Sequence, residues 1–185
     1  VPQAVTSLAI VSEALVEVDR AIPAPDPGDP TIAEVAAAAR ADRDLGPAGP
    51  AAYLYPTGLI PHDLDITAWC GQSLASDRPI RAAALDLALR IRREFSFDPT
   101  ATMVETPAAE AFAKRGGVCQ DFAQIMITGL RGFGLPAAYV SGYIRTLPPP
   151  GQERLVGADA THAWVLLWCG PSLGWLGIDP TNGIW

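Results

Sequence analysis

The sequence predicts one α+β domain in which helices come first and antiparallel strands follow. Apolar residues recur at helical spacing over 79–94 and 119–133. Three short runs rich in β-branched and aromatic residues come after residue 136. A run of helices followed by a run of strands is typical of α+β layers. The 185 residues, 49% of them hydrophobic, suffice for one such core.

The N-terminal segment differs in character from the rest. Residues 5–18 are apolar and β-branched, and they predict two short strands around Ser12 and Glu13. The Pro-rich stretch over 21–30 is typical of a stiff linker. We therefore expect residues 1–25 to be the remnant of a preceding β unit plus linker, and 26–185 to be the core.

Polar residues before Pro indicate where the helices start. Asp29 as N-cap and Pro30 at the first helical position predict a helix over 31–42. Residues 45–77 mix Gly, Pro and aromatic residues, and we assign them no regular structure.

The strongest predicted helix spans 79–94. Asp77 or Ser76 is its expected cap. Its arginines over 90–93 are expected to form a solvated end, where the helix dipole favours cations. Its expected buried face contains Ile80, Ala84, Leu87 and Ile91.

Two more helices and three strands complete the core. Thr106-Pro107 predicts a short helix to about residue 114, and the helix over 119–133 should bury Phe122, Ile125, Met126 and Leu130. The expected strands cover 137–146, 161–168 and 174–178, with an exposed loop at 147–160.

Charge and composition exclude several classes of protein. The net charge is −7 and the basic residues are scattered, so we expect neither nucleic-acid nor membrane-surface binding. No Gly-rich phosphate loop and no His/Glu pair at metal-binding spacing occurs, so we expect no cofactor and no metal. Three cysteines without a C-x-x-C pair favour a reduced, cytoplasmic setting.

Cys119 is the candidate nucleophile because it follows two glycines and begins a helix. The helix dipole and the free N–H groups at such a terminus favour thiolate over thiol. A backbone N–H beside the sulfur can stabilise an oxyanion. Cys119 could instead be a small buried hydrophobic residue.

His162 and Asp179 are the candidate partners of this cysteine. If 161–168 and 174–178 pair symmetrically around Gly170-Pro171, residues whose numbers sum to 341 face each other, and His162 lies opposite Asp179. An aspartate there can accept the Nδ1 proton and leave Nε2 for a thiol. His162 could otherwise be a core imidazole. We expect the other polar, sulfur and aromatic candidates to be structural or inert: His62, Asp121, Cys70, Cys169, Trp164 and Trp175.

Four segments resemble the transglutaminase-like core, most closely its bacterial branch of predicted cysteine proteases. They are RGGVCQDFA at 115–123, GLPAAYVSGY at 134–143, THAW at 161–164 and GWLGIDPTNG at 174–183. The resemblance covers about 50–185. It implies a papain-like α+β fold, with the nucleophile at the start of a central helix packed on an antiparallel sheet.

The resemblance also implies roles and departures. Cys119 would be the nucleophile, His162 the base and Asp179 the orienting acid, without a metal. Leu166 stands where an acidic residue often follows HAW, and the chain stops at Trp185, so we expect a core truncated at its C-terminus.

We therefore expect a cysteine peptidase or amidase that hydrolyses an amide bond in a peptide or protein. Two alternatives stay open. Resolution by a lysine amine would make the reaction protein-glutamine transamidation, and a domain without catalysis could use the same fold to bind a peptide or protein.

Overall fold

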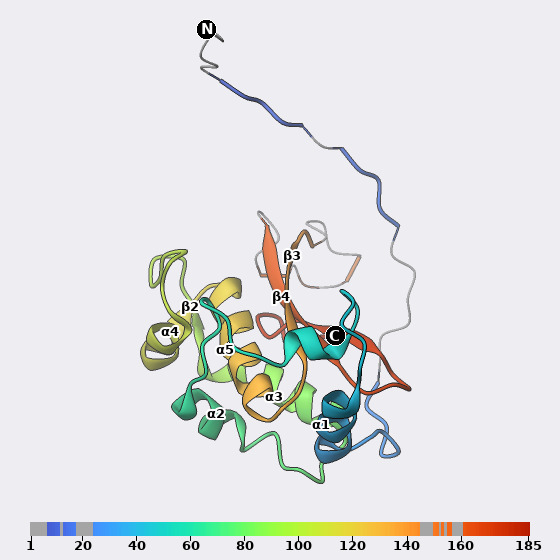
Figure 1. The fold of residues 1–185 in the computed structure, drawn as a ribbon. Coiled ribbons are helices and arrows are strands. Elements are labelled where there is room, and N and C mark those ends of the chain that lie inside the picture. The colour runs from blue at the N-terminus through green and yellow to red at the C-terminus, as the bar shows by residue number, and fades with distance from the viewer. Residues whose placement is uncertain are drawn as a thin grey trace, which may run out of the picture.

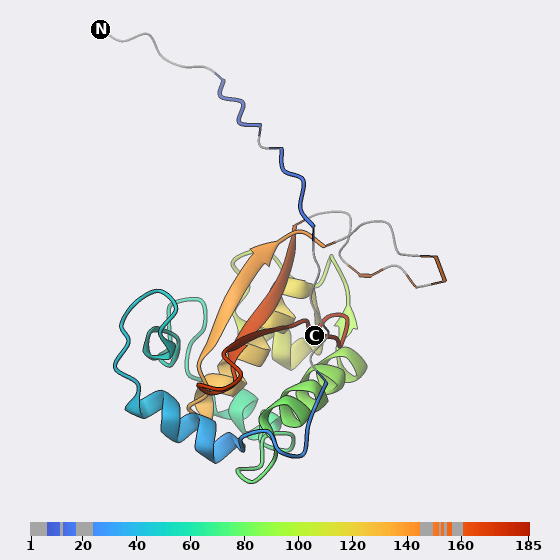
Figure 2. The same cartoon turned by 90° about the vertical axis from the view of Figure 1, so that its right-hand side faces the viewer.

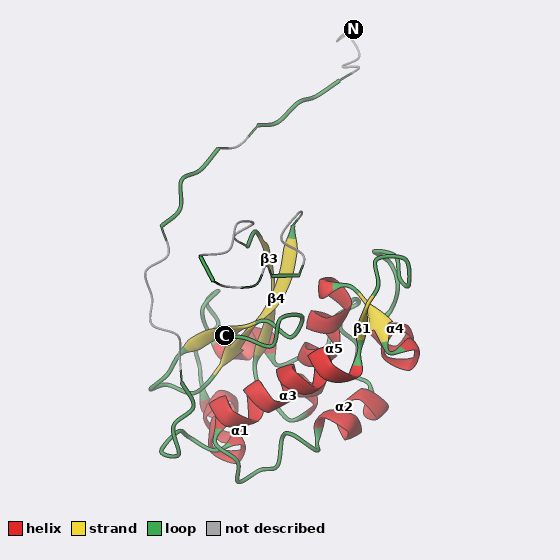
Figure 3. Cartoon of the chain, turned by 180° about the vertical axis from the view of Figure 1, so that it is seen from behind, coloured by secondary structure: helices red, strands yellow, loops and turns green. Residues whose placement is uncertain are grey.

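Helix α5 (Cys119–Gly132) is the centre of the fold (Figure 1). The computed structural model describes residues 7–11, 13–17, 24–144, 150–151, 153, 155–156 and 161–185. Helix α5 contacts strands β3 and β4 as well as the other helices α2, α3 and α4. Figure 3 shows α1, α2 and α3 gathered below the strands. The expected α+β fold, with a central helix on an antiparallel sheet, is confirmed.

The main sheet contains three antiparallel strands in the order β3–β4–β5 (Figure 2). Strand β3 is Ala137–Gly142, β4 is His162–Trp168 and β5 is Trp175–Ile178. All three expected strands are present, although β3 ends at Gly142, earlier than predicted. Residues 145–146 and much of the predicted 147–160 loop lie outside the described residues.

The apolar stripe of α5 is completely buried, as its spacing predicts. The residues of this stripe are at most 2% exposed: Phe122, Ile125, Met126 and Leu130. Gly134 ends the helix in the left-handed region, at φ 72°. The N–H of Leu135 then donates to the carbonyl of Leu130 at 3.0 Å, which closes the last turn.

Helix α1 (Ile32–Ala41) starts later than the sequence predicts. Its N-cap is Thr31, not Asp29, and Glu34 completes a capping box. Asp29 is buried and accepts a hydrogen bond from Arg81 Nε at 2.7 Å. The long-range ion pair therefore takes the side chain that we expected to cap the helix.

Helix α3 (Ile80–Glu94) begins without the expected cap from Asp77 or Ser76. Pro79 is its N-cap residue and makes no side-chain hydrogen bond. The backbone of Pro30 instead accepts from Ile80 N at 2.9 Å, because 76–79 runs beside the start of α1. The predicted apolar face is confirmed, since its residues are unexposed: Ile80, Ala84, Leu87 and Ile91.

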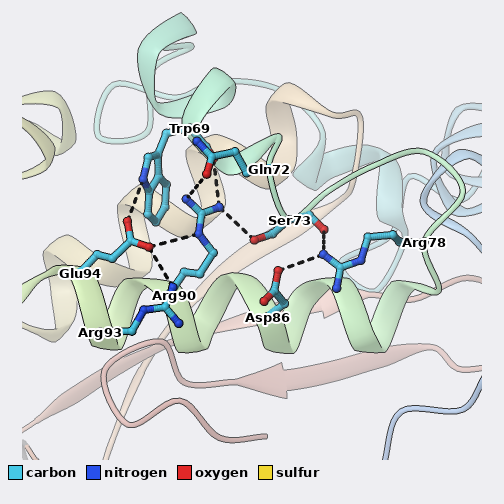
Figure 4. Close-up of polar contacts among 8 residues, drawn as sticks. All are labelled: Trp69, Gln72, Ser73, Arg78, Asp86, Arg90, Arg93 and Glu94. Atoms are coloured by element: carbon cyan, nitrogen blue, oxygen red, sulfur yellow. Dashed lines mark hydrogen bonds and ion pairs between the residues drawn. The ribbon is translucent and has the colours of Figure 1, made fainter.

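The arginines of α3 are not all solvated. Arg90 is 7% exposed, and its guanidinium lies 4.2 Å from the ring centre of Trp69. It donates to Ser73 Oγ at 3.0 Å and to Gln72 Oε1 at 3.2 Å (Figure 4). This network ties α3 to the end of α2. Because its donors find these acceptors, Arg90 can occupy the buried face of the helix.

Helix α2 (Leu64–Cys70) lies inside the region that we predicted to be irregular. Asp63 caps it by accepting from Ile66 N at 2.8 Å. The helix has only seven residues, too few for a clear apolar period. It packs closely on α5, since a Cβ at Gly129 would lie 2.7 Å from Cys70 Cβ. The same region contains the 3₁₀ helix η1 (Pro50–Tyr53).

A second, parallel pair of strands leads into α5. Strand β1 (Ser96–Phe97) pairs with β2 (Gly116–Gly117), which follows helix α4 (Ala108–Lys114). Helix α4 thus confirms the helix predicted from Thr106-Pro107. Arg115 links α4 to β2 and lies 4.1 Å from the ring centre of Phe112.

The strands expected over 5–18 are absent from the described part of that segment, 7–11 and 13–17. Its large apolar side chains are at least 74% exposed. A strand needs a neighbouring strand for its backbone N–H and C=O groups, and these residues have none among those described. That residues 1–25 belong to a preceding β unit stays a prediction. In the described parts of the chain, no helix has the length and apolar character of a membrane span.

Candidate active site

Cys119 is the first residue of α5 and is partly exposed. The β1–β2 pair fixes the backbone just before it. Asp98 N donates to Gly117 O at 2.9 Å, which extends this pair by one bond. The β1–β2 pair therefore holds in place the N-terminus of α5, where the thiol lies.

Asp121 has the structural role that we expected. It is 1% exposed, and its Oδ2 accepts from Val118 N at 2.8 Å and from Thr102 Oγ1 at 2.6 Å. The carboxylate occupies the space beside Gly117, where an added Cβ would lie 2.9 Å from Asp121 Cγ. A side chain at position 117 would collide with Asp121, so this position requires glycine.

We expect Gly117→Val to slow alkylation of Cys119 in a protein that remains soluble. The new side chain displaces Asp121 from Val118 N, a capping bond of about 1 kcal/mol, and shifts the first turn of α5. Gly116→Ala is the matched control, because the atoms nearest to its Cβ are 3.6 Å away or more. The measurement is the iodoacetamide rate. Equal rates in the two folded variants would show that Gly117 is incidental.

His162 and Asp179 meet as expected, but not through the predicted register. The observed pairs include Trp168 with Trp175 and Val165 with Ile178, so the numbers sum to 343 and not 341. Asp179 lies just past β5, two residues before the position that would face His162 in this register. A shift of two residues keeps the side chains on the same face, so the pair meets diagonally. The distance from His162 Nε2 to Asp179 Oδ2 is 2.8 Å.

The imidazole is turned the other way from our expectation. Nε2, and not Nδ1, contacts Asp179. Nδ1 is buried and forms no hydrogen bond of standard geometry with a described residue. Because Nε2 is occupied, Nδ1 is the nitrogen left for the Cys119 thiol.

Asp179 is held by the turn that follows β5. Its Oδ1 accepts from Thr181 N at 2.9 Å, and its Oδ2 accepts from Asn182 Nδ2 at 2.6 Å. Both oxygens therefore act as acceptors. The Asp-Pro-Thr-Asn order is a signal for such a turn, since Asp commonly bonds the backbone two residues on.

The electrostatics favour a charged cysteine–histidine pair. Burial raises the pKa of the Cys119 thiol, but the neighbouring His162 and the backbone N–H groups of Ala163 and Gln120 outweigh it, and the pKa lies below its ordinary value. Burial lowers the pKa of His162, but Asp179 and Cys119 outweigh it and raise the pKa to about 9. Between these two pKa values, thiolate and imidazolium coexist.

The other candidate side chains lie apart from this pair or support it. Cys70 and Cys169 are unexposed, and burial raises the pKa of each to about 12, so the expectation that they are inert agrees with their surroundings. His62 is exposed. Trp164 stacks on His162 with 6.2 Å between the ring centres.

We expect iodoacetamide at about pH 6 to modify Cys119 well before Cys70 or Cys169. Only Cys119 combines a lowered thiol pKa with partial exposure. Peptide mass spectrometry over a time course measures the order of labelling. Equal labelling of the three cysteines in the folded protein would contradict the assignment.

Leu166 fits an apolar setting, although we noted that an acidic residue is common at its position. It is half-buried in β4 and lines a small cavity with Ala138, Tyr53 and Trp175. An acidic side chain there would be desolvated without a partner among these neighbours.

A larger cavity of about 510 Å³ lies along α5, and the residue that follows Cys119 is one of those that line it. Its floor includes Gln120 and Gln124, and its walls include Tyr53, Ile60 and Tyr139. Neither glutamine was among the candidate residues, because single polar residues within an apolar helix give no signal in the sequence. Within the described residues, no group of three His, Cys, Asp or Glu side chains could hold a metal ion.

An α+β core with a cysteine at the start of its central helix, beside a histidine and an aspartate from an antiparallel sheet, is the arrangement of the transglutaminase-like class. The family model of the transglutaminase-like superfamily matches residues 68–180. The chain belongs to this superfamily.

Relatives occur in mycobacteria and in Pseudomonas. An uncharacterized protein of Mycobacterium tuberculosis is 38% identical over 181 residues, which cover 95% of this chain and 56% of the relative. A protein-glutamine gamma-glutamyltransferase of Pseudomonas aeruginosa is 36% identical over 112 residues, which cover 56% of this chain and 17% of that protein. The chain thus spans about half the length of the mycobacterial relative.

Two solved structures share the fold. A proposed cysteine protease from Cytophaga hutchinsonii has a TM-score of 0.62 at 23% identity, over 78% of this chain and 45% of that one. The periplasmic domain of TgpA from Pseudomonas aeruginosa has a TM-score of 0.57 at 26% identity, over 76% of this chain and 49% of that one.

Proposed function

We propose that this protein hydrolyses an amide bond in a peptide or protein, with Cys119 as nucleophile, His162 as base and Asp179 as the acid that orients the imidazole. The observation that supports this most is the hydrogen bond of 2.8 Å from His162 Nε2 to Asp179 Oδ2. It fixes the ring and leaves Nδ1 for the thiol. The raised pKa of His162 and the lowered pKa of Cys119 agree with these roles.

The first half of the reaction forms a thioester. The Cys119 thiolate attacks the amide carbon, and the first-turn N–H groups of α5, which have no helical acceptor, stabilise the oxyanion. The C–N bond then breaks as the His162 imidazolium gives its proton to the leaving amine nitrogen. Asp179 stays ionised throughout and stabilises the imidazolium.

The second half restores the enzyme. His162 takes a proton from water, and the resulting oxygen nucleophile attacks the thioester carbon. The C–S bond breaks, a carboxylic acid leaves and the thiolate is regenerated. The net change is amide plus water to acid plus amine.

Transamidation is the second candidate function. It is favoured by the Pseudomonas relative whose name is protein-glutamine gamma-glutamyltransferase. In that case a lysine amine attacks the thioester in place of water. The first half of the reaction and the three residue roles are unchanged.

One experiment separates these outcomes. Glutamine-containing peptides are incubated with the protein, with and without a primary amine, and analysed by mass spectrometry. Chain cleavage or conversion of glutamine to glutamate supports hydrolysis, whereas an amine adduct supports transamidation. Cys119→Ser is the control. If neither product forms across a broad peptide library, and Cys119 is unreactive, the domain binds without catalysis and the proposal is wrong.

A further inference from the structure

Trp164 lies beside His162 on strand β4. The two residues are two positions apart, so their side chains share one face of the strand. Their ring centres are 6.2 Å apart and the ring planes differ by 23°, which is the geometry of an offset stack. The indole therefore covers one face of the imidazole, and His162 is only 1% exposed.

Gly142 makes room for this indole. It is the residue of β3 that pairs directly with His162, and Trp164 is its diagonal neighbour on β4. Diagonal neighbours in an antiparallel pair are within reach of an aromatic side chain. A Cβ at position 142 would lie 2.6 Å from Cη2 of Trp164 and 3.1 Å from its Cζ3. The indole thus occupies the space that a side chain opposite His162 would otherwise fill.

The imidazole needs more than one contact to direct both of its nitrogens. The hydrogen bond of 2.8 Å between Nε2 and Asp179 Oδ2 fixes the position of one ring atom. The ring can still tilt about that contact and turn Nδ1 away from the Cys119 thiol. The titratable groups that face the imidazole are Asp179, from the turn after β5, and Cys119, from α5. Asp179 meets the ring at its edge, and so does a thiol paired with Nδ1, so neither limits the tilt as a stacked indole does.

We propose that Trp164 is a positioning residue, whose indole, admitted by Gly142, fixes the tilt of the His162 imidazole so that Nδ1 points at the Cys119 sulfur. This inference rests on the cysteine–histidine pair of the proposed function and adds the contact that keeps the pair aligned. An aligned imidazolium stabilises the thiolate, and a tilted one does so less. Trp164 acts through His162 and needs no contact with the substrate.

The first test replaces the indole by a side chain that fills space without a flat face. Trp164→Leu should raise the midpoint of the Cys119 thiolate titration, measured by ultraviolet absorbance against a Cys119→Ala blank, by about 0.4–1 pH unit. The pH profile of alkylation by iodoacetamide should shift equally and reach the natural rate above about pH 10, where the thiol is ionised in both proteins. Trp164→Phe retains a flat ring and should shift the midpoint less than Trp164→Leu does.

Trp175→Leu is the matched control for this change. Its indole lies on the neighbouring strand and packs edge-on against Tyr53, with 5.1 Å between the ring centres. It should lower stability without moving the thiolate titration. A shift in Trp175→Leu equal to that in Trp164→Leu would mean that general destabilisation, and not the stack on His162, moves the midpoint, and the inference would be wrong.

Gly142→Ala tests the same contact with both aromatic side chains in place. The new Cβ must push the indole aside, so the titration should shift in the same direction as in Trp164→Leu. The backbone of Gly142 is outside the left-handed region, so alanine is otherwise accepted there. Gly58→Ala is the matched control, because nothing lies within 4 Å of its added Cβ, and it should leave the titration unchanged. If Trp164→Leu does not fold, Gly142→Ala decides alone.

The outcomes separate this inference from the proposed function. If Cys119 of the natural protein titrates below its ordinary pKa but a folded Trp164→Leu or Gly142→Ala variant titrates like it, the positioning role is wrong and the nucleophile stands. If Cys119 of the natural protein titrates as an ordinary thiol, the proposed function fails, and Trp164 is judged by NMR on the Cys119→Ala protein. There, both substitutions should speed the exchange of the His162 Nε2 proton with water, because a tilting ring opens its bond to Asp179 more often. An unchanged exchange rate would overturn the inference.

Discussion

In His162→Ala the Cys119 thiol should lose its reactivity at pH 6 and the protein its turnover. The largest influence that lowers the pKa of Cys119 is the neighbouring His162, and without this side chain the effect of burial is opposed only by the backbone. Each unit by which the thiol pKa rises lowers the thiolate fraction at that pH about tenfold. Loss of the general acid–base group should reduce turnover by about 10²- to 10⁴-fold.

The pH dependence gives this variant a distinctive readout. In the natural protein, alkylation should already be rapid below the ordinary thiol pKa, because the thiolate is paired with an imidazolium up to about pH 9. In the variant, the rate of alkylation of Cys119 should begin to rise only at higher pH. His62→Ala is the matched control, since that histidine is exposed, and its profile should equal that of the natural protein. A His162→Ala profile that coincides with the control would mean that the helix terminus alone activates the sulfur.

The sequence predicted which strands pair, but not their exact register. The apolar runs located β4 and β5, whereas the loop between them is longer than the symmetric turn that we assumed, so Trp168 faces Trp175. The side chains still meet because a shift of two residues preserves the face of each strand. The ring orientation of His162 could not be predicted, since it depends on where the Asp179 turn places both carboxylate oxygens.

Predictions from local sequence patterns were wrong where a distant segment of the chain supplied the interaction partner of a side chain. Asp29 looks like an N-cap, but Arg81, far along the chain, binds its carboxylate. Arg90 looks solvated, but its guanidinium is enclosed by the end of α2. The cavity along α5 is similar, because residues from two loops remote in sequence line it together with α5.

Asp179→Asn should move the Cys119 thiolate titration to higher pH and destabilise the turn after β5. Both oxygens of Asp179 accept hydrogen bonds: Oδ1 from Thr181 N, and Oδ2 from Asn182 Nδ2 and His162 Nε2. An amide has one oxygen, so either orientation brings an NH₂ group against a donor. The unsatisfied contact should cost about 1–3 kcal/mol of unfolding free energy.

The lost charge should act on the histidine as well. Asp179 is the strongest of the influences that raise the pKa of His162 to about 9. A raised histidine pKa stabilises the fold fully below the unfolded value of about 6.5 and no longer above the folded value. The difference in unfolding free energy between the natural protein and the variant should therefore be largest below about pH 6.5 and narrow as the pH rises through 9. Urea unfolding at several pH values measures it.

Asn182→Ala separates the charge of Asp179 from the integrity of its turn. This variant removes one donor from Oδ2 but keeps the carboxylate beside His162. It should weaken the turn while the thiolate titration, followed at about 240 nm against a Cys119→Ala blank, stays close to that of the natural protein. Asp179→Asn should shift that titration, and each unit corresponds to about 1.4 kcal/mol of lost stabilisation of the ion pair. If the two variants shift it equally, Asp179 acts only by shaping the turn, and the site reduces to a cysteine–histidine pair.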